Sequence, residues 1–430
     1  MSLTKSFARP LHPAVLACAA SAVAAHAAGG GGSIRALPCG DNGQRRLVAV
    51  TPDGSVCAGN DATNAFRWTD AGGFDPLGPG FSLSTVGISD GGDTVVGYRR
   101  DESMQRWEAY RWTASSGMQS LGGWPNDRLG EFSYYASGVT GDGMVAVGSG
   151  EGAPGGAAGG TVAFRWAEST GMTPLGWLND PEFVALNSWA AAVTPDGSTI
   201  VGSCSGVVDG VLRWQNAVRW DAVGVAHALG SGPAWLESSA TAVSADGSVI
   251  AGTALLPDSG YRAVRWDAAG NALDLGVPLG AQQSGASGIS GDGSVVVGEC
   301  LMNSSAFFSA CIWTQSTGFI TLTDFLLANG IDTSGWDSLE SATAISRNGR
   351  VIVGTGTYQG CYTSFIVDLG DPASACPADL NGDGNVAGFD LGMLLANWEG
   401  QGTGDLDQSG FVNGADLGLL LSAWGPCSGG

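Results

Sequence analysis

One eleven-residue pattern occurs seven times along this 430-residue chain, and it constrains the fold more than any other feature. Each copy has an apolar β-branched stub, in most cases an x-Asp-Gly or Asn-Gly turn, and an alternating Val/Ile run, as in "AVTPDGSTIVG" at 192–202. The turn glycines are Gly54, Gly92, Gly143, Gly197, Gly247, Gly293 and Gly349. The pattern predicts a β-hairpin in each copy, because such turns reverse the chain tightly between two alternating strands.

Two further blocks follow each hairpin and raise the number of short strands to four per unit. The first is "AFRW" at 65–68, which recurs with small changes in six units, and the second is a short run such as "MQSLG" at 118–122. Four strands per unit of about 40–55 residues are typical of β-propeller blades, whereas a β-solenoid usually repeats faster and stacked sandwiches do not repeat so closely. The sequence therefore predicts a mainly β fold with a seven-bladed β-propeller over residues 36–370. Strands near the N-terminus are expected to complete the last blade.

A tryptophan and an arginine alternate within the first of these blocks. In "AFRW" the Phe and the Trp share one face of the strand, while the Ala and the Arg share the other. The tryptophans are Trp68, Trp112, Trp166, Trp220, Trp266 and Trp313. Such regular recurrence favours packing between blades over ligand binding. The preceding arginines are expected to be structural partners of carbonyls or carboxylates.

The order of these blocks resembles the HAF-type extracellular repeat over about residues 45–370. The family's leading His is absent, since the residues before the six blocks are Asn64, Glu108, Val162, Asn216, Arg262 and Ser309. The "TPDGS" turn is also similar to turns of periplasmic Tol-type propellers. Both resemblances imply an exported bacterial β-propeller, and neither implies a defined reaction, because propellers have many functions.

The first 28 residues have the layout of a secretory signal peptide. Lys5 and Arg9 precede an Ala/Val/Leu-rich run that ends in the small residues Ala25-His26-Ala27. A membrane anchor needs about 20 apolar residues, and this run is shorter and interrupted by proline. A lipoprotein box at residues 15–18 is the other alternative, and no later segment is apolar enough to span a bilayer. We therefore expect a secreted or cell-surface protein with no membrane span.

Eight cysteines follow Cys18, at Cys39, Cys57, Cys204, Cys300, Cys311, Cys361, Cys376 and Cys427. An even number in an exported chain favours disulfides over metal thiolates, and there is no CxxC pair. The formal net charge is -22 with only 18 basic residues, so nucleic acids and anionic membrane surfaces are excluded as partners.

The composition of the tail, residues 376–427, differs from that of the repeats, and two loops in it have the pattern of calcium-binding loops. Position 6 of each loop is a glycine, and positions 1, 3, 5, 7 and 12 supply oxygen atoms, which are the ligands that calcium prefers. In the first loop these positions hold Asp379, Asn381, Asp383, Asn385 and Asp390. In the second loop they hold Asp405, Asp407, Ser409, Phe411 and Asp416, where Phe411 contributes its carbonyl. The sequence therefore predicts two bound Ca²⁺ ions.

A helix with an i, i+3, i+4, i+7 apolar stripe is predicted behind each loop. The stripes are Leu391, Leu394, Leu395 and Trp398, then Leu417, Leu420, Leu421 and Trp424. Two short helices facing each other are expected to bury both stripes, which gives a small all-α, EF-hand-like module. The two cysteines that bracket it, Cys376 and Cys427, are predicted to form a disulfide.

This tail resembles a type I dockerin, a paired calcium-loop module, over residues 376–427. The resemblance implies docking onto a cohesin-like or cell-surface protein. The sequence departs from the family where such modules select their partner, because positions 10 and 11 hold Gly388-Phe389 and Gly414-Ala415 instead of hydroxyl residues. Leu395-Ala396 and Leu421-Ser422 replace the usual basic pair.

Few residues are available for catalysis. After the predicted signal peptide the chain keeps one His, His227, and no Lys, so His-rich zinc sites and Schiff-base chemistry lack their components and no catalytic residue is assigned. A glycosidase needs only two carboxylates, and the loops between units supply Asp180, Glu182, Asp337 and Glu340. The same loops carry Trp124, Trp177, Trp235 and Trp336, which either stack on sugars or pack within the loops.

Two classes of function remain. The first is a secreted, non-catalytic binding or scaffold protein, with a propeller that binds a ligand such as a glycan and a tail that attaches the protein elsewhere. The alternative is a secreted carbohydrate-active enzyme that its tail localises to polysaccharide. Because the chain lacks most catalytic groups, the sequence favours the first class.

Overall fold

The computed structural model describes most of the chain as short antiparallel strands. It covers residues 32–39, 45–61, 64–79, 81–101, 106–125, 127, 131–152, 160–178, 183–208, 211–230, 235–257, 259–302, 307–370, 377–380, 385–400, 404–407 and 409–426. The predicted signal peptide, residues 1–28, lies outside these ranges.

Seven four-stranded sheets form the blades of one β-propeller. Blades 1 to 3 contain β2 (Arg46–Val50), β3 (Val56–Asn60), β4 (Asn64–Thr69) and β5 (Gly73–Pro79); β6 (Phe81–Ile88), β7 (Thr94–Asp101), β8 (Arg106–Thr113) and β9 (Gly117–Ser120); and β10 (Tyr134–Val139), β11 (Val145–Glu151), β12 (Thr161–Ala167) and β13 (Gly171–Pro174). Blades 4 and 5 contain β14 (Phe183–Val193), β15 (Ile200–Val208), β16 (Val211–Trp220) and β17 (Ala226–Ala228); and β18 (Glu237–Val243), β19 (Ile250–Leu256), β20 (Gly260–Trp266) and β21 (Ala272–Asp274). Blade 6 contains β22 (Ala281–Ile289), β23 (Val295–Met302), β24 (Phe308–Thr314) and β25 (Gly318–Thr321), and it is followed by helix α1 (Leu322–Ala328).

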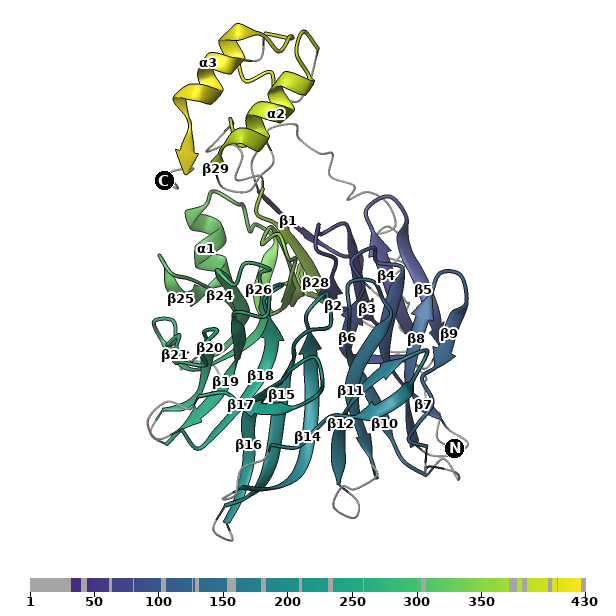
Figure 1. Cartoon of the computed structure of the whole chain (residues 1–430). Helices are drawn as coiled ribbons and strands as arrows, with labels where there is room; N and C mark the ends of the chain where they lie inside the picture. Colours follow the sequence, from purple (N-terminus) through teal and green to yellow (C-terminus); the bar gives the residue numbers. More distant parts are fainter. Residues whose placement is uncertain are drawn as a thin grey trace, which may run out of the picture. The chain divides into compact units, whose positions relative to one another are not determined.

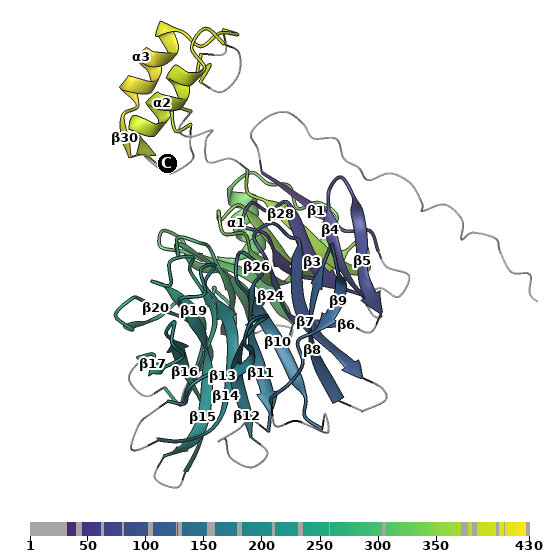
Figure 2. The ribbon, with the colours of Figure 1, turned by 45° about the vertical axis from the view of Figure 1, so that its right-hand side comes forward.

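Blade 7 is built from both ends of the propeller sequence. Its strands β26 (Trp336–Ile345), β27 (Val351–Tyr358) and β28 (Cys361–Asp368) come from the last repeat, and β1 (Ser33–Ala36) pairs antiparallel with β28 as the fourth strand. Figures 1 and 2 show β1 beside β28. A disulfide between Cys39 and Cys361 connects the same two segments. The predicted seven-bladed propeller is therefore confirmed, and an N-terminal strand completes the last blade as expected.

A buried hydroxyl group starts each of the seven hairpin turns. The hydroxyl residues are Thr51, Ser89, Thr140, Thr194, Ser244, Ser290 and Ser346, all nearly inaccessible to solvent. In blade 4 the Thr194 hydroxyl donates to Asp196 Oδ1 at 2.7 Å and accepts the Thr199 N–H at 3.0 Å. Gly197 follows with a φ of 72°, a conformation that favours glycine. The hydroxyl, the carboxylate and the glycine together define the turn geometry of the repeat.

The tryptophans and arginines of the repeated block lie between neighbouring blades. The Trp220 indole N–H donates to the Gly176 carbonyl of blade 3, and the Trp266 indole N–H donates to the Gly230 carbonyl of blade 4, both at 2.7 Å. Three arginines face the tryptophan of the next blade, with Arg67 near Trp112, Arg111 near Trp166 and Arg265 near Trp313 at 5.4–6.0 Å from the ring centroids. These arginines thus have an aromatic partner that the sequence prediction of carbonyl or carboxylate partners did not include.

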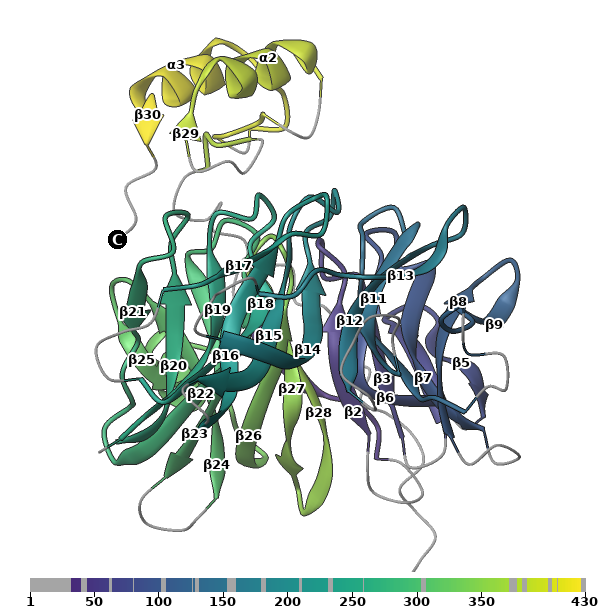
Figure 3. The same cartoon turned by 60° about the horizontal axis from the view of Figure 1, so that its bottom comes forward.

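The tail contains two helices, α2 (Gly388–Ala396) and α3 (Gly414–Ser422), and two very short strands, β29 (Asn385–Val386) and β30 (Gly425–Pro426). The helices lie side by side in Figures 2 and 3. Val386, Leu394, Val412 and Leu420 are buried at the centre of this segment. The Val386 strand pairs with Gly425, and Val412 hydrogen-bonds in the same way to Glu399, which is 26 residues before Gly425. The two halves of the tail therefore repeat one structure.

The cysteines and the apolar stripes of the tail differ in part from the sequence prediction. Cys300 and Cys311 form a disulfide within blade 6, but Cys57 and Cys204 are free and buried in blades 1 and 4. Burial raises the pKa of both free thiols to about 12. Cys376 and Cys427 lie outside the described residues. Among the described residues, no helix combines the length and the apolar character that crossing a membrane requires.

Candidate functional site

Three carboxylates of the second acidic loop converge in the tail. The side chains of Asp405, Asp407 and Asp416 bring their oxygens within 4.8 Å of one another. Asp416 is fully buried at the start of α3 and accepts the N–H groups of Leu406 at 2.7 Å and Asn413 at 2.8 Å. The Asn413 N–H bond is the main reason that the pKa of Asp416 lies below its ordinary value. Asp416 is thus held as a carboxylate that faces two more acids.

Backbone amides fix the other side of this loop. Asp405 accepts the N–H groups of Ser409 at 3.0 Å and Gly410 at 2.8 Å, and Asp407 also accepts the Ser409 N–H at 3.0 Å. Gly410 has a φ of 97°, which explains the glycine at loop position 6. Ser409 donates its hydroxyl to the Phe411 carbonyl at 3.3 Å. The structure thus brings together all five predicted ligand residues of the second loop.

Only part of the first acidic loop is described, and that part repeats the second. Asp390 is fully buried and accepts the N–H groups of Leu380 at 2.8 Å and Ala387 at 2.7 Å, each 26 residues before its counterpart in the second loop. Asp379 is also buried. Asn381 and Asp383 lie outside the described residues, as does the side chain of Asn385. Of the predicted first site, the structure therefore places Asp379 and Asp390.

The chemistry of these loops suits a hard cation. Carboxylate and carbonyl oxygens are the ligands of Ca²⁺ and Mg²⁺, and three carboxylates this close together repel one another when no cation lies between them. Within the described part of the second loop there is no His or Cys, which transition metals prefer. The donor set of the second loop therefore fits calcium.

Half of the apolar stripe behind the loops is exposed, contrary to the sequence prediction. Leu394 and Leu420 are fully buried, whereas the outer members of each stripe face solvent in this segment. The exposed residues are Leu395 at 50%, Trp398 at 41%, Leu421 at 52% and Trp424 at 50%, with Phe389 at 80% and Phe411 at 55% beside the loops. Two helices of nine residues each cover only one side of each other, so each stripe is wider than its partner can bury.

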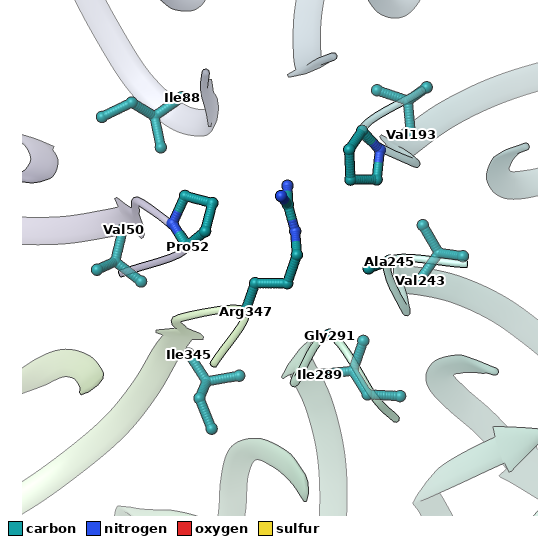
Figure 4. A pocket seen from close by; sticks show the side chains of 11 residues that line it. Val50, Pro52, Ile88, Val193, Val243, Ala245, Ile289, Gly291, Ile345 and Arg347 are labelled. Atoms are coloured by element: carbon teal, nitrogen blue, oxygen red, sulfur yellow. The ribbon is translucent and has the colours of Figure 1, made fainter. Parts of the chain in front are cut away.

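The axis of the propeller contains a small cavity of about 120 Å³, lined mainly by valines, isoleucines and prolines of the inner strands and turns. Figure 4 shows Arg347 reaching into the middle of this ring. Its guanidinium forms a bidentate ion pair with Asp90, at 2.8 and 2.9 Å. The single cation in the cavity lining is therefore neutralised within the protein, and the cavity offers no acid–base pair among its lining residues.

Backbone hydrogen bonds connect the turns around this axis. Asp90 N–H donates to Gly141, Gly141 N–H to Pro195, Ala245 N–H to Gly291, and Gly291 N–H to Arg347, at 2.8–2.9 Å. At the two equivalent positions held by Pro52 and Pro195 there is no N–H to donate. A side chain on Gly141 would place its Cβ only 2.6 Å from the Asp90 carboxylate. These contacts make the axis a structural element of the ring.

The loop tryptophans are mostly packing residues. Trp124 is only 2% exposed, and its indole N–H donates to the Glu151 carbonyl at 2.7 Å. Trp177, Trp235 and Trp336 are partly buried against the cores between blades. Trp124 therefore cannot stack on a sugar, which corrects that interpretation for this residue.

The acids of the same loops and the remaining histidine lie apart. Asp337 accepts the Gly360 N–H at 2.7 Å, and Glu340 accepts the Ser338 and Thr357 hydroxyls at 2.9 and 3.0 Å. Asp180 and Glu182 lie outside the described residues. His227 is half exposed on β17, 3.1 Å from Asp221. Each described member of this group thus has a local hydrogen-bond partner.

A charged network in blade 2 was not predicted. Tyr110 donates its hydroxyl to Glu108 Oε2 at 2.5 Å and also contacts the Arg99 guanidinium, while Arg106 donates to Glu108 Oε1 at 2.6 Å. In the sequence this network corresponds to Glu108 and Tyr110, which replace the uncharged residue and the Phe of unit 1 and unit 3. A comparison of each unit with the others would have located it.

The fold is that of a seven-bladed β-propeller, and comparisons with known proteins agree with this. No family model matches the chain, and no curated protein is similar to it in sequence. Among solved structures, the oligogalacturonate lyase from Vibrio parahaemolyticus is 14% identical, with a TM-score of 0.50 over 80% of this chain and 98% of that chain. TolB from Acinetobacter baumannii is 14% identical, with a TM-score of 0.39 over 77% of this chain. This chain covers 65% of that TolB. These identities support a shared fold and carry no activity over.

Proposed function

We propose that this chain is a secreted, non-catalytic binding or scaffold protein. In this proposal the HAF-like propeller binds a ligand such as a glycan, and a calcium-loaded, dockerin-like module at residues 376–427 attaches the protein to a cohesin-like or cell-surface partner. The convergence of Asp405, Asp407 and Asp416 is the observation that carries the proposal. A propeller with a separate ion-dependent docking segment is an arrangement for holding two things together.

Several features support an attachment role for the tail. Its exposed leucines and tryptophans recur at equivalent positions of the two halves, although exposed apolar side chains are costly in a segment with so small a core. Contiguous exposed apolar residues are typical of protein–protein contact surfaces. From residue 371 to residue 430 the chain has acidic residues and no basic one, so we expect a partner with an apolar surface and a basic rim.

Export is supported by the same molecule. The two disulfides are compatible with an extracellular location, where disulfides form and persist. The N-terminal signal-peptide pattern supplies the route. Activity as a carbohydrate-active enzyme remains the alternative, and release of reducing sugar from common polysaccharides by the purified protein would favour it.

Calcium titration of the full chain tests the proposal. By calorimetry, the wild-type protein is expected to bind two Ca²⁺ ions per chain after chelator treatment. Asp405→Ala is expected to abolish one of the two sites, because it removes a ligand that converges with Asp407 and Asp416. Glu399→Gln is the matched control, since Glu399 is an acidic residue of the same module outside both loops.

Two outcomes would contradict this assignment. The first is no heat of calcium binding in the wild-type protein, which would make the loops acidic turns. The second is an equal loss in Asp405→Ala and Glu399→Gln, which would indicate unspecific charge attraction. Limited proteolysis with and without chelator provides a separate readout, because ion binding is expected to protect the tail.

A further inference from the structure

The seven blades provide an internal comparison that locates a specialised surface. Residues at the same register position meet the same structural requirements in every blade, so the fold does not require a departure in one blade. The position that pairs with the first residue of the repeated block holds Asn60, Tyr98, Ser149, Ser203, Thr253, Glu299 and Thr355. Among these seven described residues only Tyr98, in blade 2, is aromatic.

Two more aromatic rings join Tyr98 at the boundary between blades 2 and 3. The Tyr98 ring packs edge-on against Trp107 at 5.3 Å and against Tyr135 at 5.0 Å, and Trp107 and Tyr135 are 6.5 Å apart. All three side chains are half-buried, so each keeps part of its ring accessible. We call this trio the blade 2–3 aromatic cluster.

Polar contacts hold the cluster in place. Trp107 donates its backbone N–H to the Ser133 hydroxyl at 3.4 Å, and Arg106 donates to the Phe132 carbonyl at 3.3 Å, so the start of β10 is linked to β8. The exposed Arg100 places its guanidinium 6.0 Å from the Trp107 ring. Rings fixed by backbone contacts lose little entropy when a ligand binds, and the guanidinium adds a charged donor at their side.

We propose that the blade 2–3 aromatic cluster is a carbohydrate-binding subsite. The sugar ring would stack on Trp107 and its tyrosine neighbours, and Arg100 and the tyrosine hydroxyls would hydrogen-bond to its hydroxyl groups. Three rings cover much less than the about 800 Å² per partner of a stable protein interface, but they match one or two sugar units. This inference rests on the proposed glycan-binding role of the propeller and names its location.

The test is calorimetric titration of the full chain with hexasaccharides of cellulose, xylan, mannan and polygalacturonate. The wild-type protein is expected to bind at least one of them, and Trp107→Ala and Tyr98→Ala are expected to weaken that affinity at least tenfold. Trp107→Phe keeps an aromatic ring and is expected to stay within about threefold of wild type. Because this variant retains the ring, it separates loss of stacking from loss of folding.

Tyr261→Ala is the matched control. Tyr261 has the position of Trp107 in blade 5 and is 45% exposed, but it lacks the two tyrosine neighbours, so its loss is expected to leave the affinity within twofold. Saccharide binding that survives Trp107→Ala and Tyr98→Ala, or that falls equally in Tyr261→Ala, would overturn the subsite while the proposed function stands. No binding of any saccharide by the wild-type protein would overturn both the subsite and the glycan-binding role.

Discussion

The buried hydroxyl of each hairpin turn shows how much one side chain contributes at the scale of the residue. The Thr194 hydroxyl lies at 0% exposure, and it connects the Asp196 carboxylate to the Thr199 backbone. Its hydrogen bond is the first reason that the pKa of Asp196 is lowered, and the Ser198 N–H is the second. Thr140 lowers the pKa of Asp142 in the same way in blade 3. The hydroxyl thus organises a turn in which the Asp is a hydrogen-bond acceptor.

Removal of this hydroxyl is expected to cost stability without affecting any binding surface. Thr194→Ala leaves a buried Thr199 N–H without its side-chain acceptor, so the free energy of unfolding should fall by about 1–3 kcal/mol. Thr194→Ser keeps the hydroxyl and should lose less than about 1 kcal/mol. Denaturant unfolding followed by tryptophan fluorescence measures both, and equal losses would show that the methyl group matters more than the hydrogen bonds.

At the scale of the element, local patterns predicted strands and turns well because each blade repeats them. The Asp-Gly turns, the four strands and the recurrent tryptophans are all properties of short segments, and the structure contains them in the expected order. The apolar stripe of α2 shows the limit of this reasoning. A periodic stripe identifies a helical face, but whether Leu395 is covered depends on how many other elements are available, and that is a tertiary property.

Burial of a single partner also escaped the sequence. An even number of cysteines favoured disulfides, but Cys57 and Cys204 lie in different blades, and pairing requires Cα atoms within about 7 Å. The blade 2–3 aromatic cluster was missed because Tyr98 and Tyr135 are far apart in the sequence and only the packing of two blades brings them together. In the acidic loops, by contrast, the ligands are local, and so their convergence could be predicted from spacing.

The indole hydrogen bonds between blades provide the prediction at this scale. Trp266→Phe removes the donor to the Gly230 carbonyl and should lower the free energy of unfolding by about 1–3 kcal/mol. Trp68→Phe is the matched control, because the buried Trp68 Nε1 has no hydrogen-bond partner in the described structure, and its loss should cost less. Thermal unfolding of both variants compares them directly, and a larger effect in Trp68→Phe would refute the role given to the indole bond.

At the scale of the whole molecule, ring closure depends on segments from opposite ends of the propeller. β1 supplies the outer strand of blade 7, Leu47 donates its N–H to the Ser364 hydroxyl at 2.7 Å, and the Cys39–Cys361 disulfide spans 322 residues. The second disulfide, Cys300–Cys311, spans only 11 residues within one blade. The two disulfides therefore differ in what they restrict when the chain is unfolded.

Loss of the longer disulfide should destabilise the protein more. In the chain-entropy account, closing a loop of more than 100 residues contributes about 5 kcal/mol, whereas a loop of about 15 residues contributes about 3 kcal/mol. We therefore expect the double variant Cys39→Ala, Cys361→Ala to melt at a lower temperature than Cys300→Ala, Cys311→Ala in differential scanning calorimetry. The reverse order would show that packing in blade 6, where both cysteines are fully buried, outweighs ring closure.

The pairing of β1 with β28 also determines when this protein can finish folding. Synthesis and export proceed from the N-terminus, so Ser33 emerges first but cannot reach its neighbour until Asp368 has followed. Until then blades 1 to 6 form an arc with two uncovered edges, and such edges are sites of intermolecular strand pairing. A circularly permuted chain that begins between blades 3 and 4 would place β28 and β1 next to each other in sequence order. Its refolding would show whether the wait for the last strand is the slow step.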